Sequence, residues 1–134
     1  MFGKSFSREQ DNAINAALNY GYAILLSAVN REILSLGYIT QLGLNHCNQF
    51  NPYNLGSDLM EPLRGFIDEI VIKLMPTEFN RDIKFSLIEL LSKDVKINDT
   101  IQTFSAAIRI YCKSVFDALR NQDASEIRFI EYEL

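Results

Sequence analysis

Apolar residues recur at steps of three and four along most of the chain, which is the spacing that predicts amphipathic helices. The first such segment opens at Asp11 and continues to Leu36, where Gly37 offers a helix end. A second predicted helix covers residues 59–75. It ends at Met75, because a residue that precedes a proline disfavours helical geometry.

Two further helices are predicted in the second half of the chain. One begins after Asn80, a favourable N-cap residue, and its predicted apolar face comprises Phe85, Ile88 and Leu91, flanked by Leu87 and Leu90. The other spans residues 100–121 and has the strongest periodicity in the sequence. Residues 96–100 are predicted to link the two. The stripe of the last helix comprises Ile101, Phe104, Ile108, Tyr111, Val115 and Leu119.

Residues 37–57 have no sustained period of either kind and are rich in Asn, Gly and aromatic residues. They predict a long irregular connector, and such segments inside compact domains are often functional loops. The tail, residues 125–134, alternates apolar and acidic residues, which suits a docked extension and a partner contact equally well. The pattern therefore predicts a single all-α domain, a bundle of about four main helices with a long connector.

Gly21 lies inside the first predicted helix. A glycine there costs about 1 kcal/mol relative to alanine, so something must compensate for it. Two explanations are open: another helix packs tightly against the backbone, or a ligand approaches it closely.

Composition and charge exclude several classes of protein. The chain has 134 residues, a net charge of −4 and a pI of about 5.0, which disfavours nucleic-acid binding through bulk charge. Any nucleic-acid contact must then be local. No apolar run approaches the length of a membrane span, and the first residues do not form a secretory signal, so we expect a cytoplasmic protein without a membrane partner. Cys47 and Cys112 are far apart and are expected to be reduced thiols, and with one histidine a structural zinc site lacks ligands.

Three residues are candidates for a metal site. His46 lies in the connector, and Asp58 and Glu61 follow it, three residues apart and hence on one helix face. One imidazole with two carboxylates suits Mn²⁺ or Mg²⁺ in an enzyme that acts on phosphates. A purely structural interpretation stays open: the two acidic residues also form a capping box at a helix start, and a loop histidine often serves only as a hydrogen-bonding residue.

Other candidate contacts depend on weaker patterns. Arg109, Lys113 and Arg120 share a face of the last predicted helix and are candidates for DNA phosphate contacts, although Asp117 on that face suits a solvated surface. Four aromatic residues are candidates for base stacking or for the core: Tyr20, Tyr22, Phe50 and Tyr53. The sequence contains no Gly-rich phosphate loop, G-x-S-x-G motif or H-E-x-x-H motif.

Three longer segments of the sequence resemble a known protein family. They are DNAINAALNYGYAILLSAVNREILSLGY, LGLNHCNQFNPYNLGSDLMEPLRGFID and FNRDIKFSLIELL. They are similar to the C-terminal helical half of the CRISPR-associated endonuclease that serves as the integrase of spacer acquisition, in the form found with single-protein effectors (type II systems). The resemblance runs nearly end to end, and the histidine followed by a DLMEP-like motif is specific.

The resemblance implies both a site and a reaction. His46 and Glu61 match the family's metal ligands and catalytic positions, with Asp58 as a neighbouring acidic residue and Mg²⁺ or Mn²⁺ as the ion. The family joins the 3′-hydroxyl ends of spacer-precursor duplex DNA to a CRISPR repeat by transesterification and cleaves branched DNA in the reverse direction. It forms homodimers, which bind a small ferredoxin-like protein, the second CRISPR-associated adaptation protein.

The sequence also departs from the family pattern. Family members are longer and have an N-terminal β-domain, followed by a helix with a further metal-binding glutamate. Glu9 is not expected to replace that glutamate, because it is predicted to lie in a linker before the first helix. We therefore expect residues 1–134 to form the C-terminal catalytic lobe, with the N-terminal β-domain absent and little activity alone. The alternative is a non-catalytic helical module that binds adaptation proteins or DNA.

Overall fold

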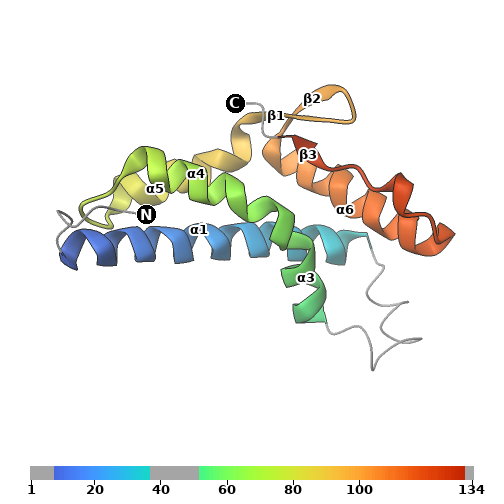
Figure 1. Cartoon of the computed structure of the whole chain (residues 1–134). Helices are drawn as coiled ribbons and strands as arrows, with labels where there is room; N and C mark the ends of the chain where they lie inside the picture. Colours follow the sequence, from blue (N-terminus) through green and yellow to red (C-terminus); the bar gives the residue numbers. More distant parts are fainter. Residues whose placement is uncertain (1–7, 37–51, 132–134) are drawn as a thin grey trace.

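The computed structural model describes residues 8–36 and 52–131, and these residues form a predominantly helical domain with a small sheet. The long helix α1 (Arg8–Ser35) runs along one side, and α4 (Arg64–Leu74) lies across it (Figure 1). Helix α3 (Pro52–Met60) projects near the carboxyl end of α1, and α5 (Arg81–Glu89) lies beside α4. Helix α6 (Phe104–Asn121) and the sheet complete the domain.

The hydrophobic core forms where α1, α4 and α6 meet. Among the largest fully buried side chains are Phe66 of α4 and Phe104 of α6, whose ring centroids are 4.7 Å apart. Burial of each such side chain contributes about 1.5–3 kcal/mol, so these two rings are among the side chains that contribute most to stability. The all-α prediction is confirmed, and the chain holds its main helices together through one continuous core.

A three-stranded antiparallel sheet is the feature that the helical pattern did not predict. Strands β1 (Asp94–Ile97) and β2 (Thr100–Thr103) form a hairpin, so the predicted linker at residues 96–100 is wrong. Asn98 and Asp99 both have positive φ, of 54° and 61°, which is the backbone of a tight hairpin turn and is favourable for these residue types. Strand β3 (Ile130–Glu131) pairs with the other edge of β1. The tail therefore docks on the domain, as one of the two interpretations expected.

The hairpin shortens the last helix. Helix α6 begins at Phe104 rather than at residue 100, because the Thr103 side chain accepts a hydrogen bond from the Ala106 amide and caps it. Ile101 was predicted to belong to the buried stripe, but it lies on β2 and is 72% exposed. Phe104, Ile108 and Tyr111 of the stripe are buried as predicted, whereas Val115 is half-buried and Leu119 is exposed.

The predicted apolar face of α5 is partly wrong. Asn80 does cap the helix, since its side chain accepts a hydrogen bond from the Ile83 amide, and a 3₁₀ turn, η2 (Leu90–Ser92), extends the helix. Leu87 and Leu90, however, are the buried residues, whereas Phe85 is 61% exposed and Ile88 is exposed as well. The packing of α5 against α1 rotates the buried face away from the predicted one.

The predicted helix over residues 59–75 is also divided. Helix α3 starts at Pro52, inside the predicted irregular connector, and a 3₁₀ turn, η1 (Glu61–Leu63), separates it from α4. Helix α4 ends at Leu74 as the following Met75-Pro76 pair predicted, and Met75 adopts a left-handed conformation with φ of 43°. The remainder of the connector, residues 37–51, lies outside the described residues, as does the predicted helix end at Gly37.

The structure answers the question of Gly21 in favour of tight helix packing. A Cβ atom at this position would lie 2.5 Å from Cγ2 and 3.2 Å from Cδ1 of Ile67 on α4. Cγ2 belongs to a β-branched side chain with little rotamer freedom in a helix, so it cannot move aside easily. Glycine at this point thus lets α4 approach the backbone of α1.

We predict that Gly21→Ala lowers the free energy of unfolding by up to about 2 kcal/mol. Overpacking costs about 1–3 kcal/mol, and the higher helix propensity of alanine returns at most about 1 kcal/mol. Urea denaturation followed by circular dichroism measures the change. Ser27→Ala, at an exposed position of the same helix, is the control and should leave stability equal or slightly higher; a stabilised Gly21→Ala variant would contradict the packing account.

Candidate metal and DNA site

Glu61 lies at the junction between α3 and α4, where the chain passes through η1. Its side chain is 62% exposed, and the preceding Met60 keeps helical backbone angles, φ −71° and ψ −28°. Asp58, three residues earlier on α3, is also exposed. Helical backbone from Asp58 to Glu61 places the two carboxylates on one side of the chain, as predicted.

The capping-box interpretation of Asp58 and Glu61 is wrong. Asp58 lies within α3 rather than before a helix, and Met60, the N-cap residue of η1, makes no side-chain cap hydrogen bond. Neither carboxylate is therefore needed to start a helix at this junction. Helix capping therefore does not explain the acidic pair.

A buried hydrogen bond fixes the junction that carries Glu61. The Tyr111 hydroxyl of α6 donates to the Leu59 carbonyl oxygen, with an oxygen–oxygen distance of 2.9 Å. Carbonyl groups at the end of a helix have no partner within it, so this bond satisfies one of them away from water. It ties α6 to the last turn of α3, two residues before Glu61.

Glu61 belongs to a cluster of polar side chains between α1 and α4. Arg64 Nε lies 3.3 Å from Glu61 Oε2, and the Arg64 guanidinium carbon lies 4.8 Å from the centre of the Tyr22 ring on α1. The Tyr22 hydroxyl in turn donates a hydrogen bond to Asp68 Oδ1 on α4. We call Glu61, Arg64, Tyr22 and Asp68 the Tyr22 cluster.

The environment of Tyr22 raises its pKa to about 12. Burial is the largest cause, followed by the hydrogen bond to Asp68 and the negative charge of that carboxylate; the Arg64 cation acts in the opposite direction. Tyr22 was a candidate for base stacking, and the structure instead places its ring against Arg64. Tyr20 packs edge-on against Phe79, while Phe50 lies outside the described residues and no side chain is described for Tyr53.

Arg64 and Asp68 were not singled out in the sequence. The available signal was their spacing: Arg64 follows Glu61 by one helical turn, and Asp68 follows Arg64 by another. That spacing predicts that these three side chains lie on one face of the chain. Only the packing of α1 against α4 shows that Tyr22 contacts them.

The predicted metal site falls only partly within the described residues. His46 and Cys47 lie in residues 37–51, outside them. Among residues 8–36 and 52–131, no group of three or more His, Cys, Asp or Glu side chains is placed to hold a metal ion. The oxygen donors of Glu61 and Asp58 suit a hard divalent cation, and both are exposed.

The structure corrects the expectation for Glu9. This residue lies in the first turn of α1 rather than in a linker. Glu9 lines a surface pocket with Thr77, Glu78 and Phe79, at the end of α1 opposite to α3 (Figure 1). Glu9 is therefore part of a helix, but it lies far from Glu61 and does not belong to the candidate site.

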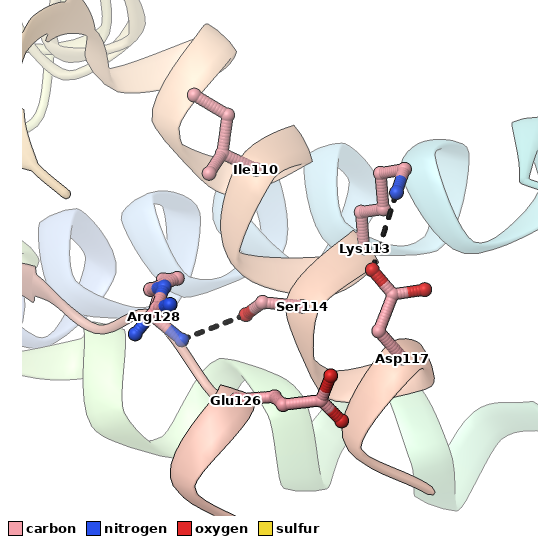
Figure 2. Close-up of a pocket in the computed structure, with 6 residues that line it drawn as sticks. All are labelled: Ile110, Lys113, Ser114, Asp117, Glu126 and Arg128. Atoms are coloured by element: carbon pink, nitrogen blue, oxygen red, sulfur yellow. Dashed lines mark hydrogen bonds and ion pairs between the residues drawn. The ribbon is translucent and has the colours of Figure 1, made fainter. Parts of the chain in front are cut away.

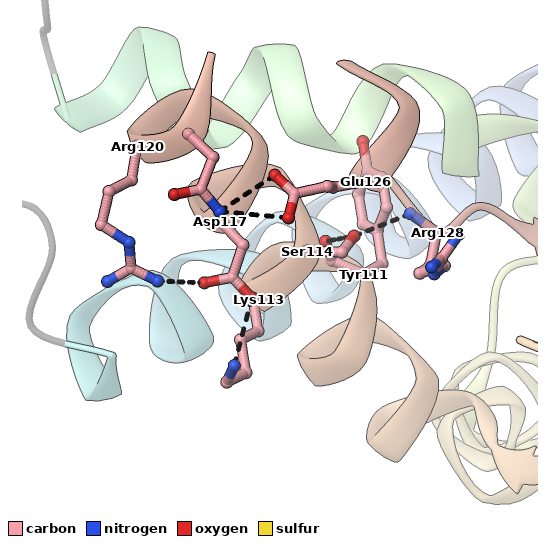
Figure 3. A network of polar contacts seen from close by, with 8 residues as sticks. Tyr111, Lys113, Ser114, Asp117, Arg120, Glu126 and Arg128 are labelled. Carbon is pink, nitrogen blue, oxygen red and sulfur yellow. Dashed lines mark hydrogen bonds and ion pairs between the residues drawn. The ribbon is translucent and has the colours of Figure 1, made fainter. Parts of the chain in front are cut away.

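The three cations predicted to contact DNA are each paired with an acidic side chain. Arg109 Nε lies 3.8 Å from Glu32 Oε1, and Lys113 Nζ lies 3.1 Å from Asp117 Oδ2. Arg120 pairs with the other oxygen of Asp117 (Figure 3). All three cations are more than half exposed, whereas Glu32 and Asp117 are only 13% and 24% exposed. The cations can therefore reach a phosphate from the surface, while the carboxylates that they leave are partly buried.

A shallow pocket of about 270 Å³ lies beside these cations, between α6 and the tail (Figure 2). The Ser114 hydroxyl accepts a hydrogen bond from the Arg128 amide and donates one to the Tyr111 carbonyl, which docks the tail onto α6. Side chains of both charges line the pocket, so it has no net attraction for an anion. They are Lys113, Arg128, Asp117 and Glu126.

Comparison with known proteins shows the family. Residues 2–107 match the family model described as CRISPR associated protein Cas1. This chain belongs to the Cas1 family. The matched range contains both His46 and Glu61.

Three Cas1 relatives illustrate the extent of the similarity. The CRISPR-associated endonuclease Cas1 of Neisseria meningitidis serogroup C is 36% identical over 98% of this chain and 45% of its own length. The CRISPR-associated endonuclease Cas1 1 of Pyrobaculum aerophilum is 34% identical over 60% of this chain and 29% of its own length. The CRISPR-associated endonuclease Cas1 1 of Francisella tularensis subsp. novicida is 36% identical over 54% of this chain and 23% of its own length.

The chain thus spans less than half the length of these Cas1 relatives. Within the described part of the chain, no helix combines the length and apolar character needed to cross a bilayer. Cys112, one of the two cysteines, is a buried free thiol, and burial raises its pKa to about 12.

We predict that the Tyr22 cluster makes stability depend on pH in the alkaline range. The pKa of Tyr22 is about 12 in the folded protein and about 10 in an unfolded chain, so its contribution is present below pH 10 and declines as the pH rises to 12. Tyr22→Phe, which also loses the hydrogen bond to Asp68, should be less stable by about 1 kcal/mol at pH 9.

The difference between the wild type and Tyr22→Phe should then shrink between pH 10 and 12. Urea midpoints at several pH values measure it, and Tyr111, whose pKa is also about 12, is retained in both proteins and cancels. A difference that stays constant over this range would contradict the raised pKa of Tyr22.

Proposed function

We propose that this chain forms the metal-binding helical part of a CRISPR-associated DNA endonuclease and integrase. The observation that carries the proposal is the position of Glu61: it is an exposed carboxylate at a fixed helix junction, within the range that matches the Cas1 family. The names of the relatives add support, since they are CRISPR-associated endonucleases. The proposed reaction joins the ends of spacer-precursor duplex DNA to a CRISPR repeat.

In this proposal His46 and Glu61 hold a Mg²⁺ or Mn²⁺ ion, with Asp58 as a further acidic residue beside them. When bound, the ion supplies charge stabilisation at a phosphodiester and lowers the pKa of an attacking hydroxyl. The Tyr111–Leu59 hydrogen bond keeps the Glu61 backbone in place, and in the metal-free protein the Glu61 carboxylate pairs with Arg64. Precise placement of this kind supplies much of the rate in phosphoryl transfer.

The reacting groups belong to the DNA. A 3′-hydroxyl oxygen of the incoming duplex forms a new bond to a phosphorus atom of the repeat, and the bond from that phosphorus to its former 3′-oxygen breaks. The broken strand leaves with a new 3′-hydroxyl group, which takes up a proton. Attack and departure both involve DNA oxygens, so no serine or cysteine nucleophile is required, in agreement with the motifs of the sequence.

Basic side chains contact the phosphate backbone of DNA and position it on the protein. Arg109, Lys113 and Arg120, whose side chains are exposed, are the proposed contacts on α6, once phosphate replaces the carboxylates of Glu32 and Asp117. The other proposed partners are a second copy of the full-length protein and a small ferredoxin-like adaptation protein. Because this chain spans less than half of the Neisseria relative, the proposed reaction is that of the longer protein.

A chimera tests this function. Residues 2–134 of this chain replace the matching part of the Neisseria relative, and the purified chimera is assayed with branched DNA and with duplex ends in Mn²⁺. We expect cleavage and joining that depend on the metal. His46→Ala and Glu61→Ala should each lower the rate about 100-fold or more, because each removes a metal ligand.

Glu69→Gln is the matched control, since this acidic residue lies on α4 and pairs with Lys73. It should keep the activity of the parent chimera. Joining that survives Glu61→Ala would contradict the metal-ligand assignment. A chimera with a native circular dichroism spectrum but no activity would favour the alternative, a non-catalytic module that binds DNA or adaptation proteins.

A further inference from the structure

Arg64 makes two contacts of different kinds. Its Nε atom pairs with the Glu61 carboxylate at 3.3 Å, and its guanidinium stacks on the Tyr22 ring at 4.8 Å from the ring centre. The first contact depends on the charge of Glu61. The second depends on the electrons of an aromatic ring that belongs to another helix, so it persists whatever happens to Glu61.

The ring that holds Arg64 is itself fixed. The Tyr22 hydroxyl donates to Asp68, and its backbone lies next to Gly21, where Ile67 of α4 packs against α1 too closely to leave room for a Cβ atom. A tyrosine has few rotatable bonds, and both ends of this one are held. The guanidinium therefore has a stable position within one ion-pair distance of Glu61.

We propose that Arg64 is a built-in counter-cation for Glu61: it occupies the carboxylate until a divalent metal binds there, and it then remains on the Tyr22 ring to face a DNA phosphate. This inference rests on the proposed function, since it takes Glu61 as a metal ligand. It makes Arg64 a positioning residue in the metal-free protein and a phosphate contact in the loaded one.

Electrostatics sets the direction of the effect. Arg64 is 45% exposed and Glu61 is 62% exposed, and an ion pair this exposed to water is weak enough to be exchanged. A guanidinium that stays on Tyr22 repels a divalent cation at Glu61, so it weakens metal binding. A DNA phosphate attracts both cations and relieves the repulsion, so metal and DNA should each strengthen the binding of the other.

The test is a titration of the 134-residue chain with Mn²⁺, with free Mn²⁺ measured by electron paramagnetic resonance. Arg64→Gln should bind Mn²⁺ with a Kd about three- to tenfold lower than the wild type, because the competing charge is gone. A purely structural role for Arg64 gives the opposite sign or no change. The spectroscopic readout is independent of any DNA joining.

Two variants serve as matched controls in the same titration. Lys73→Gln removes one positive charge from an exposed ion pair on the same helix, where Lys73 Nζ lies 3.3 Å from Glu69 Oε1, and should leave the Kd unchanged. Arg64→Lys keeps the charge and should bind Mn²⁺ as the wild type does. Circular dichroism establishes that each variant is folded.

Addition of a short DNA duplex tests the second half of the proposal. The duplex should lower the Mn²⁺ Kd of the wild type more than that of Arg64→Gln, because the phosphate has lost one of its two cations in the variant. Equal lowering in the two proteins would overturn the phosphate contact.

Glu61→Gln separates this inference from the proposed function. If Glu61→Gln loses Mn²⁺ binding while Arg64→Gln binds no more tightly than the wild type, the counter-cation role is overturned and the proposed function stands. If Glu61→Gln binds Mn²⁺ like the wild type, or if neither the 134-residue chain nor the chimera with the Neisseria relative binds it, Glu61 is not a ligand and both are overturned.

Discussion

The close contact between α1 and α4 at Gly21 is the constraint on which the rest of the arrangement depends. Ile67 approaches the α1 backbone at the one point where no side chain intervenes. The next residue on each helix then makes the next contact, since the Tyr22 hydroxyl donates to Asp68. One helical turn earlier on α4, Arg64 reaches the Tyr22 ring and pairs with Glu61. An apolar contact between two helices thus determines where the candidate ligand lies.

A second contact holds the same region from the opposite direction. Tyr111 of α6 is almost fully buried and donates to the Leu59 carbonyl at the end of α3. Glu61 therefore follows a turn that is fixed by α6 and precedes a helix that is fixed by α1. This arrangement combines a rigid backbone with an exposed carboxylate, which suits a metal ligand that must be preorganised and still reach solvent and DNA.

The sequence predicted the amphipathic helices and missed the elements that depend on turns and tertiary packing. Helix α6 buries the first half of the stripe that its periodicity predicted, whereas Ile101 belongs to a strand and Leu119 is exposed. The hairpin signal was present in Asn98 and Asp99, which tolerate positive φ, but four-residue strands of mixed polarity have too short a pattern to recognise. From their spacing alone, Asp58 and Glu61 could form a capping box at a helix start. The helix that starts at Pro52 rules this out, because it places Asp58 inside a helix. Arg64 could be recognised as a site residue only once α1 had placed Tyr22 beside it.

The central claim is that Glu61 exchanges its contact with Arg64 for a divalent metal. Crystals of this chain grown with Mn²⁺, with diffraction recorded at the manganese absorption edge, test it directly. The account predicts an anomalous peak at the Glu61 carboxylate and the His46 imidazole, with Arg64 still stacked on Tyr22. An ordered Glu61 that remains paired with Arg64, with anomalous density only at other positions, would contradict it.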